Sequence, residues 1–180
     1  MMTAFAIWFQ NLPLFIFLRN STLAFPVILT LHVIFISVFG AMIFATDLRL
    51  LGWGLRKYSM ADVIDPLRLP KRVGFVLVVT CGILVLGTKA EEYFLNPFFQ
   101  LKILLLMLVG VHALLFRGNV YNNAAALDAT PEPPARAKLA GAFSLLLWLG
   151  IACAGRSIGY INGPVGSHHF AALFSPLTRL

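Results

Sequence analysis

Four long apolar runs constrain the fold of this chain more than any other feature. They cover approximately residues 23–46, 73–90, 97–116 and 139–160. A helix needs roughly 20 residues to cross the hydrocarbon core of a bilayer, with a range of about 17–25. Only 12% of the 180 residues are charged, against roughly 25% in a soluble domain. The sequence therefore predicts an all-α protein, a transmembrane four-helix bundle that forms one integral membrane domain over residues 1–180 and whose partner is the lipid bilayer.

The loops between the runs predict the orientation of the bundle. Nine of the fourteen basic residues fall in the first and third loops: Arg49, Arg56, Lys57, Arg68, Lys71, Arg72, Arg117, Arg136 and Lys138. Because positive charge is enriched in cytoplasmic loops, these loops should face the cytoplasm and both termini should lie outside. For a bacterial cell this predicts a multi-pass protein of the inner membrane.

The first 20 residues are not typical of a further span. Gln10, Asn11 and Pro13 interrupt the apolar sequence, and neither the basic start nor the cleavage site of a signal peptide is present. Trp8 and several phenylalanines suit the headgroup region of a bilayer. We expect an interfacial helix over residues 1–20 at the outer face.

The net charge of +7 raises the question of nucleic-acid binding. The basic residues follow the membrane boundaries instead, and the chain has no basic stripe with interleaved aromatic residues. No nucleic-acid partner is expected. Paired carboxylates and nucleophile–base pairs are also lacking, so the sequence assigns no catalytic residue and leaves open whether the protein is an enzyme.

Polar residues inside the apolar runs are candidates for function because they are costly in lipid. His32 lies about 13 Å below the outer end of the first run, by a rise of about 1.5 Å per residue. Lys102 and Arg156 lie in the outer part of the third and fourth runs. The three side chains form a candidate cofactor-binding layer for an acidic group, such as a haem propionate or a quinone oxygen. The alternatives are a structural His32 and two basic residues that extend to the interface.

His112 in the third run is a further cofactor-binding candidate, as the partner of His32 in a bis-histidine b-type haem. Its Cα should lie roughly 9 Å deeper than that of His32, which makes convergence on one iron difficult. A copper site was also considered, because Cu(I) accepts imidazole and sulfur ligands. Its ligands would come from one residue in each run: His32, Cys81, Met107 and Cys153.

Two packing features are also expected. Gly155 and Gly159 form a small-xxx-small pair that is typical of a close helix contact. Asp47 at the end of the first run and Arg72 at the start of the second could form an ion pair that holds the first helical hairpin together.

Three stretches of the chain resemble a known family: HVIFISVFGAMIFATDLRLLG, NPFFQLK and SLLLWLGIACAGRSIGY. They resemble an uncharacterised family of small bacterial inner-membrane proteins with four spans. The architecture is also similar to the copper-resistance D-type membrane domain and to the small haem-binding protoporphyrinogen oxidase. In those relatives a histidine in the first span and a lysine in the third are prominent, and His32 and Lys102 match them. The resemblance implies a haem or copper site.

Three functions remain open from the sequence. The first is a cofactor-binding membrane protein, with b-type haem or quinone in an electron-transfer role and His32 as the ligand or as a proton contact. The second is a non-catalytic accessory or structural subunit, with other membrane subunits or further copies of the chain as its partners. The third is the handling of copper or a small solute, for which the broken helices and inverted repeats of transporters are lacking.

Overall fold

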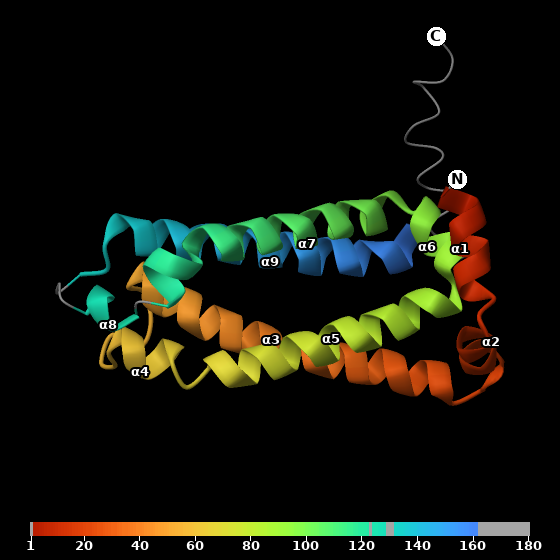
Figure 1. The fold of residues 1–180 in the computed structure, drawn as a ribbon, viewed down its shortest axis with the longest axis horizontal. Helices are drawn as coiled ribbons and strands as arrows, with labels where there is room; N and C mark the ends of the chain where they lie inside the picture. Colours follow the sequence, from red (N-terminus) through yellow and green to blue (C-terminus); the bar gives the residue numbers. More distant parts are fainter. Residues whose placement is uncertain (1, 123, 129–131, 162–180) are drawn as a thin grey trace, which may run out of the picture.

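The four apolar runs form four long helices in the computed structural model, which describes residues 2–122, 124–128 and 132–161 (Figure 1). These helices are α3 (Ala24–Leu51), α5 (Arg68–Thr88), α7 (Pro97–Phe116) and α9 (Ala135–Ile161). Each contains a stretch long and apolar enough to cross a membrane. Within the described residues no strand occurs, so the predicted all-α four-helix membrane bundle is confirmed.

Short helices gather at the two ends of the bundle (Figure 1). One end, called here the α4 end, has α4 (Met60–Ile64), the π-helix η1 (Arg117–Tyr121) and α8 (Ala124–Leu127). The other end, called here the α1 end, has α1 (Met2–Gln10), α2 (Pro13–Asn20) and α6 (Ala90–Leu95). Both predicted basic loops lie at the α4 end, while the side of the membrane that this end faces stays a prediction.

The N-terminal segment forms two helices where one was expected. Leu12 is extended, with φ −64° and ψ 143°, and Pro13 begins α2. Proline disfavours a helical conformation in the residue before it and suits the first position of a new helix, which explains the break. α1 packs against α6, and α2 packs against α5. Phe15 is buried against Gly87 of α5, so closely that a Cβ at Gly87 would overlap its ring.

The ends of the long helices follow local chemistry. Asn96 caps α7, because its side-chain oxygen accepts a hydrogen bond of 2.9 Å from the backbone N–H of Phe98. α3 continues to Leu51, beyond the expected end at residue 46. It stops at Gly52, which has a φ of 75°, a left-handed conformation that glycine adopts without strain. α5 begins at Arg68 rather than at residue 73, since Pro70 lies in its first turn, where no backbone donor is needed.

The long helices pack in a chain of neighbours. α5 packs on α3, α3 on α9, and α9 on α7. Over the described residues the α5–α7 pair is not among the main helix contacts, and Figure 1 shows α7 and α9 on one side with α3 and α5 on the other. The best-buried apolar cluster lies at the α4 end and contains Leu50, Met60, Ile64, Val120, Ala124, Leu127, Ala137 and Ala140. Most of the long helices' large apolar side chains face outward, as a surrounding of lipid requires.

Candidate functional site

His32 lies on α3 and turns its ring toward α5. The ring carbon Cε1 is 3.1 Å from the position that a Cβ at Gly82 would occupy, so the absence of a side chain at Gly82 makes room for the imidazole. The ring forms a hydrogen bond with the backbone of Val78. Its Nδ1 atom is buried and has no hydrogen-bond partner among the described residues. A buried polar atom without a partner is costly, so this nitrogen is the first candidate for contact with a ligand.

Lys102 lies on α7 and turns its ammonium group toward α9. The Nζ atom is 3.5 Å from the position of a Cβ at Gly155, so a second glycine makes room for a second polar group. Within the described part of the chain no residue forms a hydrogen bond or ion pair with this ammonium. Its charge acts on the imidazole of His32, which places the two groups in one electrostatic environment. His32, Lys102, Gly82 and Gly155, one from each long helix, are called here the His32–Lys102 site.

Arg156 does not join this site. Its side chain is exposed, its guanidinium carbon lies 5.1 Å from the centre of the Tyr160 ring, and Nη2 donates a hydrogen bond of 3.3 Å to the Tyr160 hydroxyl. The reason is helical geometry, because adjacent residues point about 100° apart. Since Gly155 faces Lys102, Arg156 faces away from it. Among the described residues no atom lies within 4 Å of the Gly159 Cβ position, so the expected glycine pair does not form one common helix contact there.

His112 lies at the α4 end and is held there. It is only 8% exposed, its Nε2 atom is 3.0 Å from the backbone oxygen of Ala140 on α9, and its ring centre is 4.9 Å from that of Phe116. The structure does not bring His112 to His32, in agreement with the different depths of the two residues. The role shown for His112 is to connect α7 with α9.

The four residues considered for copper do not converge. Cys81 is buried, but Cys153 is exposed and Met107 is 64% exposed on the outside of the bundle. Throughout the residues that the structure describes, no three His, Cys, Asp or Glu side chains are placed to hold a metal together.

A second set of polar side chains lies inside the α4 end, around Asp47. The sequence did not predict that these side chains come together. Asp47 of α3 is 1% exposed, and its Oδ2 atom lacks a hydrogen-bond partner among the described residues. Lys71 of α5 acts on it by charge, and Ser144 of α9 hydrogen-bonds with it. The ammonium of Lys71 donates a hydrogen bond of 2.7 Å to the hydroxyl of Thr46. Thr46, Asp47, Lys71, Tyr121 and Ser144 are called here the Asp47 cluster.

The expected ion pair between Asp47 and Arg72 is wrong. Lys71 acts on Asp47 instead, and Arg72 forms no ion pair with it in the described residues. Residues 71 and 72 point about 100° apart on α5, so only one of them can face α3. The signal in the sequence for a polar partner at Ser144 was a serine within the fourth apolar run.

Tyr121 closes the Asp47 cluster from η1, outside the spans. Burial raises the pKa of its hydroxyl, and the negative charge of Asp47 raises that pKa further, while a hydrogen bond with Ser144 lowers it. Tyr121 therefore remains protonated and serves as a neutral hydrogen-bonding group. Its backbone oxygen accepts a hydrogen bond of 2.8 Å from Arg68, which fixes η1 on α5.

The two polar sites differ in what they can do. The Asp47 cluster contains residues of four elements, α3, α5, η1 and α9, and connects the helices where the apolar core is best formed. The His32–Lys102 site has a nitrogen and an ammonium for which no partner occurs among the residues that the structure describes. A nitrogen lone pair and a cation together suit a ligand that has both an electron-pair acceptor and an anionic group.

Comparison with known proteins gives one match, to the model of a protein family. Neither a curated protein nor a solved structure matches the chain. The model of a family of unknown function, DUF6644, matches residues 23–161, which include all four long helices, the His32–Lys102 site and the Asp47 cluster. The chain is an integral membrane protein of four apolar helices and belongs to the DUF6644 family.

Proposed function

We propose that this protein binds a b-type haem at the His32–Lys102 site and serves in electron transfer in the bacterial inner membrane, with its α4 end in the cytoplasm. The observation that carries the proposal is the buried Nδ1 atom of His32, which has no partner among the described residues. A neutral imidazole nitrogen is a common axial ligand of haem iron. When bound, the haem would supply one-electron redox chemistry, and the residues of this chain would hold and orient it.

Lys102 suits the acidic edge of the same cofactor. It lies five residues after Pro97, the start of α7, and so about 7 Å from the end of that helix. His32 lies eight residues after Ala24, or about 12 Å into α3. A haem with its iron at His32 and a propionate at Lys102 would have its acidic groups nearer the membrane surface, where charge is less costly.

The resemblance to the copper-resistance D-type domain and to the haem-binding protoporphyrinogen oxidase supports the same two residues. A first-span histidine and a third-span lysine are prominent in those proteins, and only His32 and Lys102 correspond to them here. This argument is one of analogy, because a shared architecture does not determine an activity. A quinone is a second ligand class that hydrogen-bonding groups of this kind can bind.

Visible spectra of the protein purified in mild detergent test the proposal. We expect a Soret band in the wild-type protein that shifts on reduction. His32→Gln should abolish the band, because the axial nitrogen is lost. His112→Gln is the matched control and should keep it, since His112 bonds to Ala140 rather than to a ligand. Lys102→Gln should leave the ligand in place but weaken haem retention.

Two results would contradict the haem proposal. A wild-type protein without a Soret band would exclude it, and quinone extracted from the same sample would then identify the other ligand class. Equal loss of the band in the His32→Gln and His112→Gln variants would show a general effect of damage to the bundle.

A non-catalytic accessory subunit is the second candidate. The observations that favour it are that the α5–α7 pair is not among the main helix contacts over the described residues and that both helices carry exposed apolar side chains such as Val76 and Leu104. Another membrane subunit or a second copy of this chain would bury them. Such a protein would purify colourless and together with its partner.

A further inference from the structure

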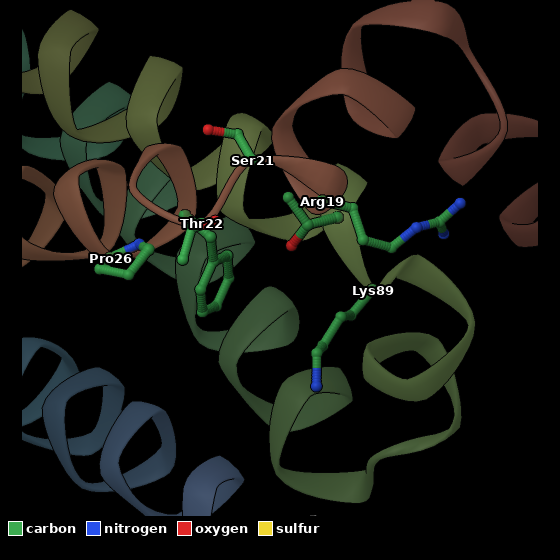
Figure 2. Close-up of a pocket in the computed structure, with 7 residues that line it drawn as sticks. Arg19, Ser21, Thr22, Pro26 and Lys89 are labelled. Carbon is green, nitrogen blue, oxygen red and sulfur yellow. The ribbon is translucent and has the colours of Figure 1, made fainter.

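Two adjoining pockets lie at the α1 end, where α2 and the start of α3 meet the end of α5. The first has a volume of about 290 Å³ and the second about 410 Å³, and both are lined by Arg19, Thr88 and Lys89. Figure 2 shows Arg19 and Lys89 on the side of the first pocket opposite Pro26. The pockets are separate from the His32–Lys102 site and from the Asp47 cluster.

The pockets lie at the level of the membrane surface. α3 enters its apolar stretch at Ala24, immediately after the pocket residues Ser21 and Thr22. α5 leaves its apolar stretch at Thr88, immediately before Lys89. In a bilayer this level is occupied by lipid headgroups, and the apolar residues that follow on α3 face the acyl chains.

The charged side chains around the pockets have few hydrogen bonds or ion pairs among the described residues. The guanidinium of Arg19 has no ion pair or hydrogen bond within the described residues. Lys89 Nζ lies 3.5 Å from Glu92 Oε2, and both side chains are about half exposed, at 49% and 55%. Glu91 is different, because Gln10 of α1 donates a 3.4 Å hydrogen bond to its carboxylate. Arg19 and the exposed Lys89–Glu92 pair are therefore accessible to an outside molecule, which would meet two cations and a carboxylate that is only weakly paired with one of them.

We propose that the two pockets bind the headgroup of an amine-bearing phospholipid, with its phosphodiester at Arg19 and Lys89 and its primary ammonium at Glu92. An arginine presents a planar set of donors that matches phosphate oxygens, and a lysine adds a point charge. A primary ammonium has three N–H donors for a carboxylate, whereas a quaternary ammonium has none. The hydroxyls of Ser21 and Thr22 add uncharged donors at the rim of the first pocket.

The charge pattern selects this lipid class over a purely anionic one. The second pocket is lined by Arg19, Lys89, Glu91 and Glu92, two positive and two negative groups. A headgroup with one positive and one negative charge matches this balance, while an anionic headgroup without an amine would lie next to Glu92 without compensation.

Lipid binding to the full-length protein in detergent tests the proposal by native mass spectrometry. The probes are phosphatidylethanolamine, phosphatidylcholine and phosphatidylglycerol with identical acyl chains. We expect phosphatidylethanolamine to bind about fivefold more tightly than the other two. Arg19→Gln and Glu92→Gln should each remove most of that preference. Arg156→Gln, which changes an exposed arginine outside the pockets, is the matched control and should retain it.

Three outcomes would overturn the proposal. Equal binding of all three lipids would show that the pockets do not select a headgroup. Tighter binding of phosphatidylglycerol, with no effect of Glu92→Gln, would show a site for anions alone. An equal effect of Arg156→Gln and Arg19→Gln would show that surface charge, rather than the pockets, determines binding. Because all substituted side chains are exposed, these variants are expected to fold as the wild type does.

Discussion

Asp47→Ala is expected to lower the free energy of unfolding by about 3 kcal/mol or more, because it leaves the ammonium of Lys71 without its counter-charge inside the protein. Asp47 is 1% exposed, and Lys71 reaches the same interior from α5 and hydrogen-bonds to Thr46. Water cannot replace the lost carboxylate without opening the contact between α3, α5 and α9. Unfolding of the purified protein by a denaturing detergent measures the change.

Two further variants separate this effect from a general effect of carboxylate loss. Asp65→Ala removes a carboxylate that is 51% exposed and pairs with Arg68 at the surface, so it should cost at most about 1 kcal/mol. Asp47→Ala combined with Lys71→Met removes both charges and should recover part of the lost stability. Equal stability of the Asp47→Ala and Asp65→Ala proteins would show that the Asp47 cluster does not hold the helices together.

Gly141→Ala should destabilise the protein by about 2 kcal/mol, because it forces α9 away from α3. A Cβ at Gly141 would lie 2.8 Å from the backbone oxygen of Asp47 and 3.2 Å from the Cβ of Leu50. The backbone oxygen of Asp47 belongs to the last turns of α3, and a helical backbone atom cannot move aside as the end of a flexible side chain can. Thermal unfolding of the detergent-purified protein should show a clear drop in Tm.

Gly159→Ala is the matched control on the same helix. Within the described part of the chain no atom lies within 4 Å of its Cβ position, so the added methyl group meets none of these residues, and alanine favours the helix. We expect its Tm to equal or exceed that of the wild type. If Gly141→Ala were as stable as Gly159→Ala, the close contact between α9 and α3 at Asp47 would be incorrect.

The fold could be predicted from the sequence because lipid imposes simple requirements. Each span must be apolar and long enough, so the four runs marked the four helices, and Asn96 with Pro97 marked the start of α7. The break between α1 and α2 was harder to predict. Pro13 was visible, but whether it would begin a new helix depended on packing between Phe15 and Gly87, which lie 72 positions apart.

The polar sites could be predicted only in part. A sequence gives the depth of a residue in the membrane more reliably than the side of the helix on which its side chain lies. Depth along the spans suggested that His32 and Lys102 lie at a similar level, and the charge of Lys102 acts on His32, while their joint role as a binding site stays a prediction. Lys71 and Arg72 have nearly equal depth, as do Gly155 and Arg156, and a small rotation of the helix decides which one faces the interior. The Asp47 cluster escaped prediction for the same reason, since Ser144 and Tyr121 become its neighbours only through the packing of α9 and η1 on α3.

The haem content of the purified protein tests the central claim most directly. The measurement is the molar ratio of haem to polypeptide in the wild-type protein and in the His32→Gln variant, each produced with an ample supply of haem. We predict a ratio of about one in the wild type, because His32 has one buried imidazole nitrogen without a partner among the described residues, and a large loss in the variant. A ratio near zero in the wild type, or the same ratio in both proteins, would contradict the assignment of His32 as a haem ligand.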